Sequence, residues 1–112
     1  MLNQVVLVGR IVGDVEVKEL EEGRRVANLK LAVNRSYKNA EGIYETDFIN
    51  CRIWDNIATN VKEYCQKGDI VGVKGRLQSS TFEKEDGSKG SRIEVIAEKV
   101  TFLSSKRTDD EE

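Results

Sequence analysis

Apolar and polar residues alternate along most of this chain with a period of two, which is typical of β-strands. The first such segment, residues 4–12, is apolar on both faces, so we expect a strand that is covered from both sides. Residues 26–35, 44–55 and 70–80, and a last strand after Gly90, are apolar on one face only. The residues expected in the core are Ala27, Leu29, Leu31, Val33, Ile49, Cys51, Ile53, Val71, Val73, Leu77, Ile93, Val95 and Ala97.

Helical spacing replaces the two-residue period between the third and the fourth predicted strand. Asp55 and Asn56 offer an N-cap for this helix, and Gly68 offers a C-terminal cap. Turn residues predict a loop at residues 36–42 and a hairpin tip at residues 86–90. The residues expected on the buried face of the helix are Ile57, Val61, Tyr64 and Cys65.

The order of these elements predicts an all-β domain with one short helix. Three strands precede the helix and two follow it, which is the order of an OB-fold, a five-stranded Greek-key barrel with a helix between strands 3 and 4. The chain has 112 residues, which suits a single domain with a substantial core. We expect that domain to occupy residues 1–104, followed by a short, acidic, disordered tail at residues 105–112.

The third predicted strand carries an unusual set of outward-facing side chains. Phe48, Arg52 and Trp54 share that face with Asn50 and, near the start of the strand, Tyr44. Lysine and arginine also lie on the outward faces of the second and fourth strands. Aromatic rings stack on unpaired bases and cations bind phosphates, whereas the bases of a duplex are already stacked on one another. The pattern therefore indicates a surface for single-stranded nucleic acid.

Two other functions remain open from these residues alone. Exposed aromatic patches often mark protein contacts, so Phe48 and Trp54 also fit an OB-fold domain that binds another protein. The surrounding cations argue against that function, because the core of a protein interface is usually depleted of charge. Single-stranded RNA is the second alternative, because stacking does not read the 2′-hydroxyl group.

The composition provides few residues that could serve in catalysis or in metal binding. The chain has no histidine, and its two cysteines, Cys51 and Cys65, are too far apart in sequence for a Cys-x-x-Cys pair. No phosphate-binding glycine loop or nucleophile elbow is present. We therefore expect neither enzymatic activity nor a metal or cofactor, and we interpret both cysteines as small buried apolar residues.

The net charge and the targeting signals bear on the possible ligand and on the cellular location of the protein. The formal charge of −2 includes four acidic residues at 109–112, and without them 18 basic residues face 16 acidic ones. Net charge therefore does not exclude a nucleic-acid ligand. No stretch reaches the roughly 20 apolar residues of a membrane span, and no secretory signal is visible, so we expect a soluble cytoplasmic protein without a membrane partner.

Three segments resemble the bacterial single-stranded DNA-binding protein family. They are residues 3–10 (NQVVLVGR), 26–29 (VANL) and 64–68 (YCQKG), in the family's order, and the likeness runs from Leu2 to about Leu103. The resemblance implies a nucleoid-associated homotetramer of OB-folds, with contacts partly through strand one. Such a tetramer protects single-stranded DNA in replication, recombination, repair or DNA uptake.

The resemblance also implies positions for the binding residues. The family stacks bases on aromatic residues of strand three and of two long loops, at positions that match Phe48, Trp54, Tyr37 and Phe82. The residues expected to contact phosphates or to make polar contacts are Arg10, Lys30, Arg35, Lys38, Asn50, Arg52, Lys67, Lys74, Arg76 and Lys84.

The C-terminal end departs from the pattern of full-length family members. Those members end in an acidic tip with hydrophobic residues, which recruits replication and repair enzymes, whereas this chain stops at Asp109–Glu112 without an apolar cap. This weakens the expectation of partner recruitment through the tip. In this respect the chain resembles the short, competence-type paralogues of Gram-positive bacteria, which are linked to transformation.

Overall fold

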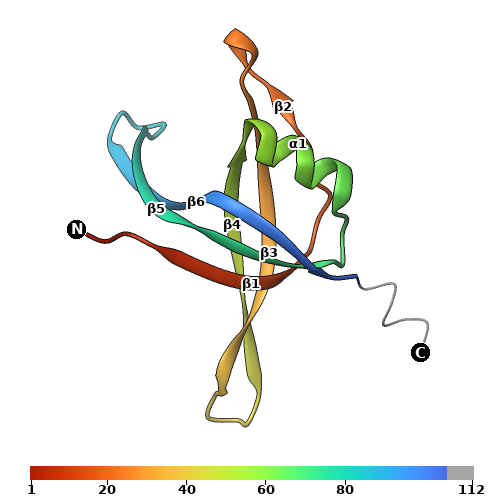
Figure 1. The fold of residues 1–112 in the computed structure, drawn as a ribbon. Helices are drawn as coiled ribbons and strands as arrows, with labels where there is room; N and C mark the ends of the chain where they lie inside the picture. Colours follow the sequence, from red (N-terminus) through yellow and green to blue (C-terminus); the bar gives the residue numbers. More distant parts are fainter. Residues whose placement is uncertain (106–112) are drawn as a thin grey trace.

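The computed structural model describes residues 1–105 as six strands, one α-helix and one short 3-10 helix (Figure 1). The expectation for the acidic tail falls largely on residues 106–112, outside the described residues. The elements are β1 (Val5–Ile11), β2 (Lys18–Glu19), the 3-10 helix (Glu21–Gly23), β3 (Arg25–Lys38), β4 (Tyr44–Trp54), α1 (Asp55–Tyr64), β5 (Ile70–Glu83) and β6 (Lys89–Ser104).

Five of these strands form a closed barrel, which confirms the predicted all-β OB-type fold. The sheet runs β1-β5-β6-β4-β3-β2, and pairing of Arg10 with Ala32 and of Ile11 with Leu31 closes it between β1 and β3. The pairing of β4 with β6 is parallel, and the other ladders are antiparallel. The helix follows β4, the fourth strand along the chain, whereas the sequence predicted it after the third strand. The additional strand is β2, which has two residues, too few to show an alternating pattern, and lies before β3.

The core lies inside the barrel, where the inward faces of the strands meet. Leu29, Leu31, Cys51, Ile53 and Val71 are fully buried, as the alternation predicts. Burial raises the pKa of the Cys51 thiol to about 11, because an apolar environment disfavours the thiolate. Helix α1 covers one end of this core with Ala58 and Val61.

The start of α1 differs from the prediction. Trp54 occupies the N-cap position without a side-chain hydrogen bond, and Asp55 is the first helical residue. The Asp55 carboxylate instead accepts hydrogen bonds from Arg24 Nη2 at 2.8 Å and from the backbone N–H of Arg25 at 3.1 Å. Asp55 therefore joins the start of the helix to the start of β3 rather than capping the helix.

The end of α1 also differs from the prediction. Tyr64 is 71% exposed rather than packed on the core, and Cys65 lies just after the helix and is only partly buried. Gly68 does not cap the helix, because it lies in a turn in which the Asp69 N–H donates to the Gln66 carbonyl. Helix α1 has ten residues, which is far too short to cross a bilayer. No helix in the described part of the chain is long and apolar enough to do so.

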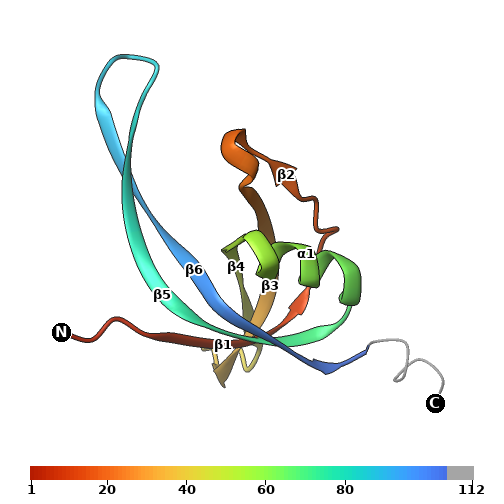
Figure 2. The ribbon, with the colours of Figure 1, turned by 45° about the horizontal axis from the view of Figure 1, so that its top comes forward.

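Two hairpins extend from the barrel as arms, one formed by β3 and β4 and the other by β5 and β6 (Figures 1 and 2). The predicted loop at residues 36–42 is shorter than expected, because β3 continues to Lys38. Tyr37 and Phe82 therefore lie on strands rather than in loops. Leu77 and Ile93, which were expected in the core, are exposed because they lie on the β5–β6 arm, where no second layer covers the strands.

Candidate nucleic-acid interface

The outward side of β3 and β4 assembles a row of aromatic and polar side chains. Phe48 is 63% exposed, and Lys30 places its Nζ 6.0 Å from the centroid of the ring. Lys30 pairs in register with Asn50, and Asn28 pairs with Arg52, so these side chains lie on the same side as Phe48. We call Phe48, Asn50, Arg52, Trp54 and Lys30 the outward row. The structure thus brings together five of the residues predicted to form the site.

Trp54 ends the outward row with one face of its indole ring already covered. The guanidinium carbon of Arg24 lies 4.6 Å from the ring centroid, and its Nη2 is 2.8 Å from Asp55 Oδ2. The hydrogen bond from Arg24 lowers the pKa of Asp55, so this carboxylate stays charged and holds the arginine in place. Trp54 is partly buried, and its ring can be reached from the groove that it lines, beside a positive charge.

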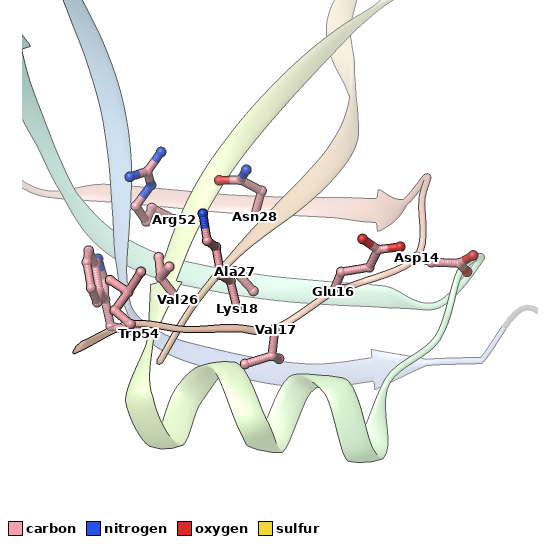
Figure 3. Close-up of a pocket in the computed structure, with 10 residues that line it drawn as sticks. Asp14, Glu16, Val17, Lys18, Val26, Ala27, Asn28, Arg52 and Trp54 are labelled. Atoms are coloured by element: carbon pink, nitrogen blue, oxygen red, sulfur yellow. The ribbon is translucent and has the colours of Figure 1, made fainter. Parts of the chain in front are cut away.

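A groove of about 770 Å³ runs beside Trp54, between the segment that contains β2 and the β3–β4 surface (Figure 3). Trp54, Arg52 and Lys18 lie toward one end of this Trp54 groove, and Asp14 and Glu16 lie toward the other. The two carboxylates repel phosphate, whereas Lys18 and Arg52 attract it. A nucleic-acid backbone is therefore favoured at the end that carries Trp54 and the cations.

A second groove, of about 420 Å³, lies between β4 and β6 and is lined by Phe48, Asn50, Arg52, Arg92 and Glu94, among others. In this Phe48 groove, Arg92 also lies over the Phe82 ring, with its guanidinium carbon 4.7 Å from the ring centroid. Arg92 therefore connects Phe48 on the barrel with Phe82 on the β5–β6 arm.

Arg52 lies between the two grooves and lines both. Its Nη2 is 3.1 Å from Glu94 Oε2, and its Nε is buried without a hydrogen-bond partner. Both side chains of this ion pair are mostly shielded from solvent. A phosphate that binds Arg52 has to compete with the Glu94 carboxylate.

Arg35 and Tyr37 lie apart from the outward row, on the opposite side of the β3–β4 arm. Arg35 donates to Asp47 through Nη2 at 2.9 Å and to Glu45 through Nη1 at 2.5 Å. This pairing raises the pKa of Arg35 and lowers the pKa of Asp47, so both groups stay charged and neutralise each other. Tyr37 follows Arg35 by two residues on the same strand and makes the smallest contribution to the rise in the pKa of Arg35.

The remaining predicted cations are spread over the barrel. Arg10 lies two strands from Phe48, but its Nη1 donates to the Gly68 carbonyl at 2.8 Å. Arg76 lies two strands from Arg52, and its Nε is 3.9 Å from Glu98. Lys74 pairs in register with Val6 of β1, Lys67 lies in the turn before β5, Lys84 lies at the tip of the β5–β6 arm, and Lys38 lies near the tip of the β3–β4 arm.

Sequence reasoning missed Arg24, Arg92 and Glu94, which contact the predicted residues. Arg24 precedes Val26, the register partner of Trp54, by two residues, so its place beside the indole follows only from the β3–β4 register. Glu94 reaches Arg52 through the pairing of β4 with β6, which are far apart in sequence. No sequence signal marks that pairing.

The chain is similar to bacterial single-stranded DNA-binding proteins. The family model of the Single-strand binding protein family matches residues 2–103. The chain is 46% identical over 106 residues to single-stranded DNA-binding protein B of Bacillus subtilis (strain 168), covering 95% of this chain and 94% of that protein. It is 47% identical over 106 residues to the single-stranded DNA-binding protein of Oceanobacillus iheyensis, covering 95% of this chain but 66% of that protein. It is 44% identical over 110 residues to single-stranded DNA-binding protein 1 of Staphylococcus aureus (strain MSSA476), covering 98% of this chain and 70% of that protein.

Proposed function

The chain belongs to the single-strand binding protein family, and from this membership we propose that it binds single-stranded DNA along the outward side of β3 and β4. The observation that carries the proposal is the exposed ring of Phe48, which has Lys30 beside it and a groove next to it. A base stacks on such a ring whatever its identity, and a cation close to the ring attracts the adjoining phosphate. The protein therefore binds with little sequence preference and without catalysis.

The arrangement of the grooves supports a path for the strand. From Phe48 the path leads past Arg52 to Trp54, along the cationic end of the Trp54 groove. In the other direction Arg92 leads toward Phe82 on the β5–β6 arm. Several stacking sites in sequence shield bases from nucleases and from reannealing, which suits a role in replication, recombination, repair or DNA uptake.

We also propose that the protein acts as a homotetramer in the cytoplasm. On β1, Val6 and Val8 are 68% and 54% exposed, and Leu103 is exposed next to Gly72, across β5 from β1. Such an apolar surface on a barrel suits contact with a second copy. Assembly places several outward rows on one DNA strand, which raises affinity through effective concentration without new contacts.

Titration with oligo-dT tests the binding proposal. Trp54 is the only tryptophan, so stacking of a base against its ring is expected to quench the intrinsic fluorescence. We expect log affinity to fall linearly with log salt concentration, by about 0.7 for each neutralised phosphate. Unchanged emission at low salt, with unchanged polarisation of a labelled oligonucleotide, would refute the proposal. Competition between matched DNA and RNA oligomers measures the preference for DNA.

Glu94→Gln is expected to tighten DNA binding by up to about fivefold, because it frees Arg52 for phosphate and an ion pair of this exposure is worth up to about 1 kcal/mol. The salt dependence is expected to become steeper. Polarisation titrations with labelled oligo-dT at several salt concentrations measure both effects.

Glu98→Gln is the matched control. It removes the same charge from β6, but Glu98 faces Arg76, at 3.9 Å, and does not line either groove. Equal effects of the two variants would show that the gain is not specific to Arg52. Weaker binding by Glu94→Gln would show that the Glu94 carboxylate itself helps to hold the DNA.

A further inference from the structure

The β3–β4 arm has two sides of different chemistry. On one side, Glu45 and Asp47 surround Arg35. On the other side, Lys38 places its Nζ 5.6 Å from the centroid of the Tyr44 ring. The first side thus carries two carboxylates for one guanidinium, whereas the second carries an aromatic ring with a cation beside it. The second side is therefore the one that suits a DNA strand.

Tyr44 lies in line with the outward row. Strand β4 pairs with β3 without interruption from Thr46 to Trp54, so its even-numbered residues lie on one side. The register shift before Lys38 places two extra residues on β3, and Lys38 then pairs with Tyr44 on this same side. Tyr44 is 55% exposed and precedes Phe48 by four residues, about 13 Å along the strand.

We propose that Tyr44 and Lys38 form a further base-stacking site for single-stranded DNA, which continues the outward row to the end of the β3–β4 arm. The ring offers an exposed face, and the Lys38 ammonium attracts the phosphate of the stacked nucleotide. Between Tyr44 and Phe48, Thr46 Oγ1 donates to Asn34 Oδ1 at 2.8 Å, which leaves a polar, uncharged surface for the strand to cross. This inference rests on the proposed function.

The position of Tyr37 strengthens the assignment. Tyr37 alternates with Lys38 along β3, so its ring points to the side that carries Arg35 and the two carboxylates. A strand that stacks on Phe48 reaches Tyr44 without changing sides. To reach Tyr37 it has to pass around the edge of the arm and approach Glu45 and Asp47. On this arm, Tyr44 is therefore the favoured stacking residue.

Nitration of tyrosines tests the site in the intact protein. The chain has three tyrosines, Tyr37, Tyr44 and Tyr64, and all are more than half exposed, so tetranitromethane reaches each of them. Saturating oligo-dT is expected to slow nitration of Tyr44 most and to leave Tyr64 unchanged, as read by mass spectrometry of the peptides. Nitration of Tyr44 at the same rate in the DNA complex would overturn the inference.

Substitution gives the energetic test. We expect Tyr44→Ala to weaken binding of labelled oligo-dT by about fivefold or more, and Tyr44→Phe, which keeps the ring, to bind like the wild type. Ile43→Ala is the matched control, because Ile43 is an equally exposed apolar residue at the same tip and lies outside the proposed site. A wild-type protein that does not bind DNA would refute the proposed function. A binding wild type with an unchanged Tyr44→Ala variant, or with a larger loss from Tyr37→Ala, would refute this inference alone.

Discussion

Replacing Phe48 with alanine is expected to weaken binding of single-stranded DNA by about 1–3 kcal/mol, or roughly 5- to 150-fold. Phe48 is the most exposed ring of the outward row, so the substitution removes a stacking surface without opening the core. Its loss also leaves the Lys30 ammonium without its aromatic neighbour. Polarisation of a labelled oligo-dT measures the loss, and Phe48→Trp, with a larger ring, is expected to retain binding.

Tyr64→Ala is the control for Phe48→Ala. Tyr64 is a comparably exposed ring at the far end of α1, about 15 Å along the helix axis from Trp54, and its removal is expected to leave DNA affinity unchanged. Sedimentation velocity of both variants reports the assembly state. If Phe48→Ala disrupted assembly and left the affinity of each subunit for DNA unchanged, the aromatic surface would be a protein interface instead.

The barrel could be predicted from the sequence because its strands have one buried and one exposed face. Burial of Leu29, Leu31, Cys51 and Ile53 follows from their two-residue spacing, and the outward row is the other half of the same pattern. The same rule fails where a strand leaves the barrel. Ile93 continues the apolar period of β6 but lies on an arm that is exposed on both sides.

The charged residues around the rings could not be predicted in the same way. Arg24 and Glu94 meet Trp54 and Arg52 through strand pairings, and a pairing between distant segments leaves no local pattern in the sequence. The register shift in β3 has a similar effect, because it decides which of two neighbouring residues, Tyr37 or Lys38, lies on the side of Phe48. The sequence therefore determines the side on which Phe48 lies, but not the side on which Tyr37 lies.

Gly75→Ala is expected to destabilise the barrel strongly. A Cβ at Gly75 would overlap the Ile96 carbonyl oxygen and lie 2.9 Å from its carbon, at the register shift in the β5–β6 ladder. Both obstacles are backbone atoms, so the β5–β6 ladder itself has to move. We expect a loss of about 3 kcal/mol or more in the free energy of unfolding, at or above the upper end of the usual cost of overpacking.

Gly72→Ala separates this steric effect from the general effect of replacing glycine in β5. At Gly72 the nearest atom to an added Cβ is Leu103 Cδ1 at 3.6 Å, an ordinary van der Waals contact, so we expect little loss of stability. Denaturant unfolding of both variants at one protein concentration measures the difference, because assembly makes stability depend on concentration.

Ile96 is also the register partner of Arg52, so a shift of β6 at this point changes how Glu94 contacts Arg52. Equal stability of the two variants would contradict the close approach of β5 and β6 on which the geometry of the Phe48 groove depends.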